Sequence, residues 1–220
     1  MARLGTGGCG YEHPLLSLYF AVSQSDPSSR DFFRDDAVLG IIMLTDEDDC
    51  SADPTRANFF EGAVPGQSGS LRCSLRGHVC GGQPVPAMPF MAPLSSCKPY
   101  EVPDGPDDGS RLLNVSFFGE RIKGMKRGRA DRLFVASIMG WDATPDATYR
   151  IVERPVGMTS ELDTGDICSN PMRGRAAPGI RLHAFTRAFA NNAIYSICAP
   201  DLGANLQDIG TKLSSLLAPP

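Results

Sequence analysis

Residues 37–45 read AVLGIIMLT, a continuous apolar run that is rich in β-branched side chains. A run of this length is too short for a buried helix and is typical of a parallel strand that is covered on both faces. Residues 132–140 (RLFVASIMG) and 193–198 (AIYSIC) have the same character. The sequence therefore predicts three buried strands.

Helical periodicity surrounds each of these strands. Apolar residues at spacings of three and four predict four helices, over residues 12–24, 111–126, 180–191 and 201–217. Strands that alternate with helices favour an α/β fold with a doubly wound, mostly parallel sheet. Three strands are few for four helices, so we expect one domain over residues 1–220 from which N-terminal strands are missing.

Composition and charge exclude several classes of function. The chain is 42% hydrophobic and 21% charged, which is ordinary for a globular protein and argues against global disorder. The net charge of −4 argues against a nucleic-acid or anionic-membrane surface, since both need clustered Lys and Arg. No apolar stretch approaches the roughly 18 residues that span a bilayer, so no transmembrane segment is predicted.

The chain has seven cysteines and no C-x-x-C pair. Residues from 50 to about 109 show no sustained periodicity and form a Gly- and Pro-rich insertion that contains Cys50, Cys73, Cys80 and Cys97. Cross-links are the natural way to order such a stretch, which favours an oxidising compartment: extracellular, periplasmic or cell-envelope. The bridge pattern stays open. The alternative is a zinc site, although the spacings lack the short paired knuckles of zinc ligands.

The first predicted strand is followed by a run of four acidic residues, Asp46-Glu47-Asp48-Asp49. In open α/β sheets ligands bind beyond the carboxyl ends of the strands. Oxygen ligands of this kind favour Mg²⁺ or Ca²⁺, so the run is a candidate cation site. The alternative is an acidic loop that is exposed to solvent.

Other motifs predict structure rather than chemistry. The stretch GTGGCG, residues 5–10, matches G-x-G-x-x-G, but no strand leads into it, so it is interpreted as a glycine-rich turn. His13, His78 and His183 accompany no nucleophile motif and are interpreted as structural. Trp141 follows the second strand and is expected to cap the sheet edge. Residues 141–178 are expected to form a polar loop.

Four stretches resemble a known family. AVLGIIMLTDEDDC, residues 37–50, resembles the fourth strand of a von Willebrand factor type A domain with its metal-ligand aspartate. GTGGCGYEHPLLSL, residues 5–18, is similar to the loop that supplies the threonine of that site and to the helix that follows. Further segments, RADRLFVASIMG and YSICAPDLGANLQDIG, resemble cysteine-rich type A domains of secreted or lipoprotein-like bacterial proteins, notably of myxobacteria.

The resemblance implies a partial metal-ion-dependent adhesion site. Thr6 and Asp46 match the threonine and the aspartate that hold Mg²⁺ or Ca²⁺, with Glu47 and Asp48 as acids behind them. The D-x-S-x-S motif has no counterpart, so binding of the ion by this chain alone is expected to be weak or absent. The implied function is a non-enzymatic binding module for a protein ligand at the C-terminal edge of the sheet.

The resemblance also organises the cysteines. Cys9 is expected to be unpaired because its partner would lie upstream, and Cys168 is expected to pair with Cys198. The strand at 37–45 would then have an open apolar edge, which invites self-association. Two alternatives remain: a metal-assisted hydrolase that uses the carboxylates of residues 46–49 with Asp142, and a structural pseudo-domain that binds no metal.

Overall fold

The computed structural model describes residues 11–23, 32–34, 36–55, 65–87, 90–102, 111–126, 128–142, 147–172 and 174–217. Its centre is a three-stranded parallel sheet in the order β1 (Leu39–Leu44), β6 (Leu133–Met139), β11 (Asn191–Ser196). The three predicted strands are therefore confirmed, and their carboxyl ends meet at one edge of the sheet.

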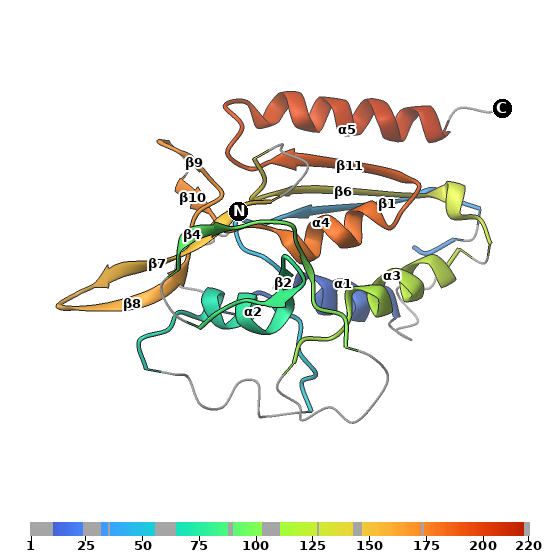
Figure 1. Ribbon diagram of the computed structural model, residues 1–220. Coiled ribbons are helices and arrows are strands. Elements are labelled where there is room, and N and C mark those ends of the chain that lie inside the picture. Colours follow the sequence, from blue (N-terminus) through green and yellow to red (C-terminus); the bar gives the residue numbers. More distant parts are fainter. Residues whose placement is uncertain are drawn as a thin grey trace.

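Helices lie on both sides of this sheet (Figure 1). One side carries α1 (Pro14–Ser23), α3 (Val115–Gly124) and α4 (Ile180–Arg187), and the other carries α5 (Leu202–Leu217). The four predicted helices are confirmed, with shorter bounds than periodicity indicated. No helix in the described part of the chain is long and apolar enough to cross a membrane.

The central strand β6 is buried along its whole length. Leu133, Val135 and Met139 belong to the main core with α1, α3 and α4. Phe134, Ala136 and Ile138 face the other way and form a second cluster with Ile209 and Leu213 of α5. Burial on both faces explains why this strand reads as an unbroken apolar run.

The edge strand β1 departs from the prediction, because only one of its faces is covered. Ile41 and Met43 are buried, whereas Ile42 and Leu44 are 48% and 63% exposed. Leu213 of α5 lies against Gly40, and Leu44 lines a pocket together with Leu202 at the start of α5. Among the described residues β1 pairs only with β6, so its outer edge has no strand partner there.

The insertion after β1 contains a helix and short strands that its sequence pattern did not predict. It holds α2 (Gly69–Gly77), β2 (His78–Cys80), β3 (Gln83–Pro84), β4 (Phe90–Leu94) and β5 (Cys97–Pro99). These strands are too short for periodicity to reveal. The disulfides Cys50–Cys73 and Cys80–Cys97 select one of the possible connectivities and exclude the zinc alternative.

The predicted polar loop at 141–178 is wrong. It contains the hairpin β7 (Tyr149–Val156)–β8 (Thr159–Thr164), followed by β9 (Cys168–Asn170) and β10 (Gly174–Ala176). With β2 to β5 these strands form three small antiparallel sheets, so "mostly parallel" describes the central sheet and not the described strands as a whole. The predicted Cys168–Cys198 disulfide is confirmed and ties β9 to the end of β11.

Candidate functional site

The acidic run after β1 divides into two halves with different surroundings. Asp46 is exposed and Glu47 is partly exposed, whereas Asp48 and Asp49 are buried. The backbone carbonyl of Asp46 accepts a hydrogen bond of 2.8 Å from the amide of Ala177. This contact holds the chain end of β1 beside β10, and the next two acids turn inward.

Asp48 caps helix α4 from a distant part of the chain. Its Oδ1 accepts from the amides of Arg181 and Leu182 at 3.1 and 3.2 Å, and its Oδ2 accepts from His78 Nε2 at 2.7 Å. The helix's own N-cap residue, Gly179, has no side chain to do this. A carboxylate is stabilised there because the first amides of a helix lack partners and carry partial positive charge.

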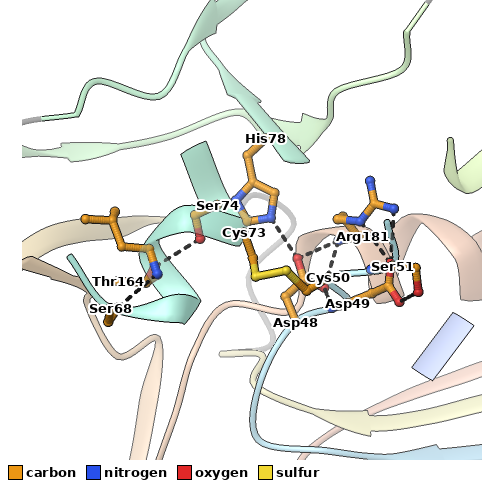
Figure 2. Close-up of a disulfide and its surroundings, with 11 residues drawn as sticks. Asp48, Asp49, Cys50, Ser51, Ser68, Cys73, Ser74, His78, Thr164 and Arg181 are labelled. Atoms are coloured by element: carbon orange, nitrogen blue, oxygen red, sulfur yellow. Dashed lines mark hydrogen bonds and ion pairs between the residues drawn. A yellow bond between two sulfur atoms is a disulfide. The ribbon is translucent and has the colours of Figure 1, made fainter. Parts of the chain in front are cut away.

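Asp49 caps helix α1 and also neutralises the buried guanidinium of Arg181 (Figure 2). Its Oδ1 accepts from the amide of Leu15 at 3.0 Å and from the Ser51 hydroxyl at 2.5 Å. Its Oδ2 accepts from Nε and Nη2 of Arg181 at 3.1 and 3.0 Å. The inner half of the acidic run therefore holds the core together and does not face solvent.

The structure gives each histidine a structural setting. His78 bridges Asp48 and the hydroxyl of Tyr149, which lies 2.9 Å from its Nδ1. Burial and the nearby Asp48 raise the pKa of Tyr149. The ring of His183 stacks on buried Trp141 with centroids 4.0 Å apart, and burial lowers the pKa of His183 to about 4. Burial likewise lowers the pKa of His13.

The outer half of the acidic run faces a polar cleft of about 560 Å³ at the C-terminal edge of the sheet. Asp46 and Glu47 form one wall. The opposite walls come from the N-terminus of α2, the β7–β8 hairpin and the β10 region, through Ser68, Gly69, Ser70, Arg154, Glu161, Asp163, Thr164, Asp166, Gly174, Arg175 and Ala177.

Hydrogen bonds hold the hairpin wall of the cleft in place. Arg154 donates through Nε to Asp163 at 2.5 Å and through Nη2 to Asp166 at 2.7 Å. The Ser68 hydroxyl, which caps α2, donates to the other oxygen of Asp163 at 2.5 Å. Ser74 and Thr164, drawn in Figure 2, join α2 to β8 through hydroxyls 3.0 Å apart. This wall is thus fixed before any ligand arrives.

The carboxylates of the β1 wall are not neutralised in the same way. Within the described ranges, neither Asp46 nor Glu47 forms a salt bridge. Burial, followed by the charges of Asp46, Glu12 and Asp163, raises the pKa of Glu47 to about 7. A carboxyl that titrates near neutral pH inside a cleft marks a candidate functional position.

A smaller, mainly apolar pocket of about 190 Å³ adjoins the cleft. The two cavities share Asp46, Gly174 and Arg175 as walls. The remaining lining comes from the ends of β1, β9 and β11 and from the start of α5, through Leu44, Asn170, Ile197, Cys198 and Leu202.

The structure brings together only part of the predicted site. Asp46 and Glu47 lie side by side at the cleft, Asp48 faces α4, and Thr6 and Cys9 lie outside the described residues. Asp142 is exposed and does not line the cleft. Sequence reasoning missed the hairpin wall, because the burial of β7 alternates only over its first three residues, Tyr149 to Ile151.

The described residues define a class: a mixed α/β protein with a parallel central sheet, three disulfides among these residues and a polar cleft at the carboxyl end of that sheet. Comparison of the chain with family models, curated proteins and solved structures finds no match.

Proposed function

We propose that this chain is a non-enzymatic binding module of the von Willebrand factor type A kind, with a doubly wound arrangement around its central sheet. The proposed ligand is a protein that docks at the C-terminal edge of the sheet. One observation carries the proposal: Asp46 and Glu47 present carboxylates to a polar cleft whose other wall is already fixed by hydrogen bonds. Open α/β sheets bind ligands at this edge.

The Mg²⁺ or Ca²⁺ prediction fits the described residues only in part. Ca²⁺ takes about six to eight oxygen ligands and Mg²⁺ about six, several of which are often waters. Among the described residues no group of three or more His, Cys, Asp or Glu side chains is placed to hold an ion. The cation prediction therefore rests on the resemblance of Thr6 and Asp46 to family ligands, and the binding proposal rests on the cleft.

The hydrolase alternative has one observation in its favour, the pKa of about 7 at Glu47, which suits a general acid or base. It has less support from the other carboxylates. Asp48 and Asp49 are engaged with helix amides, His78 and Arg181, and Asp142 lies outside the cleft lining.

Three disulfides indicate a protein that is not cytoplasmic. We propose that the chain works outside the cytoplasm, in the extracellular space, the periplasm or the cell envelope. A ligand there would be another exported protein or a surface component.

The binding proposal is tested with a displayed library of random peptides, selected on the immobilised full chain with and without Ca²⁺ or Mg²⁺. Selected peptides are expected to lose at least about tenfold in affinity for the Asp46→Asn/Glu47→Gln variant, about 1.4 kcal/mol. Glu120→Gln on α3 is the matched control, because Glu120 is 78% exposed and away from the cleft lining.

Peptides that bind the wild type and the cleft variant equally would contradict the proposal. An activity screen is the second arm. Turnover of a phosphate or glycan substrate that disappears in Asp46→Ala would contradict the binding-module proposal and support the hydrolase alternative.

A further inference from the structure

The three disulfides differ in their exposure to solvent. Cys50 and Cys73 are 0% and 6% exposed, and Cys80 is 8% exposed while its partner Cys97 is partly exposed. Cys168 and Cys198 are both partly exposed, and Cys198 also lines the apolar pocket beside the cleft. Exposed disulfides are the ones that exchange readily with thiols, while buried ones resist.

The Cys168–Cys198 disulfide, whose two cysteines are both partly exposed, fastens the small β9–β10 element to the central sheet. The β9–β10 hairpin forms a two-stranded sheet of its own. Besides the disulfide, it is held to the end of β11 by a hydrogen bond of 3.2 Å from Asn170 Nδ2 to the carbonyl of Cys198. The amide of Ala177, just after β10, donates to Asp46. Gly174 and Arg175 of this hairpin form walls of both cavities.

The two sulfur atoms have different neighbours. The Ser196 hydroxyl donates to Cys168 Sγ at 3.5 Å. A donor at this position stabilises negative charge that develops on Cys168 when the disulfide breaks. Cys198, in contrast, faces the pocket through which a thiol would approach. The geometry therefore distinguishes an attacked sulfur from a leaving sulfur.

We propose that Cys168–Cys198 is a thiol–disulfide exchange site at which a dithiol reductant attacks Cys198 and releases the β9–β10 hairpin from the wall of the cleft. The attacking thiolate forms a bond to Cys198 Sγ while the Sγ–Sγ bond breaks and its electron pair goes to Cys168. The second thiol of the reductant then displaces Cys198. The reductant leaves as a disulfide, and the protein gains two electrons and two protons as two thiols.

The exchange would control access to the cleft. Once the disulfide is open, the described contacts that still hold the hairpin are hydrogen bonds, each worth only about 1 kcal/mol, the buried side chain of Ala176 and the largely exposed ion pair of Arg175 with Asp166. The wall that carries Gly174 and Arg175 then moves apart from Asp46, and the apolar pocket and the polar cleft merge. This inference does not depend on the identity of the ligand in the cleft.

The test uses the native full chain and two probes. Brief exposure to 2-mercaptoethanol, followed by alkylation and peptide mass spectrometry, is expected to place the first mixed disulfide on Cys198. Dithiothreitol is expected to open Cys168–Cys198 at least about tenfold faster than Cys50–Cys73 or Cys80–Cys97. Ser196→Ala should slow this opening roughly fivefold, since the leaving thiolate loses a donor.

Hydrogen exchange provides the structural readout. After selective reduction the amides of Ile167 and Ala177, which donate to Ala176 and Asp46, are expected to exchange at least about tenfold faster. The Cys168→Ser/Cys198→Ser variant should show the same loss, and Cys80→Ser/Cys97→Ser should not. Earlier opening of another disulfide, a first adduct on Cys168, or unchanged protection of these two amides would each overturn the proposal.

Discussion

Arg181 and Asp49 form an ion pair in which neither side chain is exposed to solvent, with Nη2 and Oδ2 3.0 Å apart. The two residues lie 132 positions apart in the sequence. Arg181 opens α4, Asp49 follows β1, and the same carboxylate caps α1. This pair therefore joins the start of the insertion to two helices of the main core.

Asp49→Asn is expected to lower the free energy of unfolding by about 3–5 kcal/mol, because it leaves the buried Arg181 cation without its counter-charge. Denaturant unfolding measures this difference. Glu120→Gln, which removes the exposed pair with Lys123, is the control and should change stability by less than about 1 kcal/mol. A small effect at Asp49 would mean that Arg181 is solvated or paired elsewhere.

The single tryptophan reports the titration of His183, on which it stacks. Protonated imidazole quenches indole fluorescence, so the emission of Trp141 should fall with an apparent pKa of about 4 instead of the ordinary 6.5. Since the pKa of His183 is lowered in the folded state, its contribution to stability is complete above about pH 6.5 and is lost as the pH falls toward 4. His183→Phe should abolish the transition, and a midpoint near 6.5 would contradict the stacked, half-buried geometry.

Glu47→Gln should stabilise the protein at alkaline pH. The pKa of Glu47 is raised from 4.5 to about 7 in the folded state, so the native protein pays for ionising this group and loses stability as the pH rises through this window. The variant is expected to match the wild type near pH 4.5 and to gain about 1 kcal/mol at pH 8, a value reduced for partial exposure. Thermal unfolding at the two pH values measures the difference. An equal shift of the unfolding temperature at both pH values would show that the effect of Glu47→Gln does not come from ionisation of Glu47.

Two glycines provide a matched pair for backbone packing. A Cβ at Gly140 would lie 1.8 Å from the carbonyl oxygen of Ala177, whereas a Cβ at Gly210 in α5 meets nothing within 4 Å. Gly140→Ala should therefore destabilise by at least about 2 kcal/mol, because the backbone of the hairpin region must move. Gly210→Ala should stabilise by about 0.5–1 kcal/mol through helix propensity. Thermal melts of both variants check the opposite signs.

The open side of β1 is expected to support weak self-association. Ile42 and Leu44 are exposed on a strand that, within the described part of the chain, pairs along one edge only. Sedimentation of the wild type should depend on concentration, and Ile42→Thr/Leu44→Thr should reduce this dependence while it keeps β propensity. A wild type that stays monomeric at high concentration would contradict the prediction.

Local patterns were sufficient for the elements of the central layer. The apolar run in β6 is unbroken because both faces of this strand are buried. The apolar residues of α5 recur at helical spacing because one face of this helix packs on the sheet. The same patterns failed in the insertion and in residues 141–178. Strands of two or three residues carry too little periodicity, and the buried-exposed alternation of β7 holds only over Tyr149 to Ile151.

The sequence by itself determined that Asp46 to Asp49 would follow a strand at the carboxyl edge of a parallel sheet. Only the tertiary structure decided which of these acids would face a ligand. Asp48 meets the first amides of α4, 133 and 134 residues away, and Asp49 meets Arg181, while Asp46 and Glu47 remain at the cleft. The four carboxyl groups have similar chemistry but different surroundings. Asp48 and Asp49 are neutralised by helix ends and by a buried cation that come from distant parts of the chain, so only the tertiary structure places them.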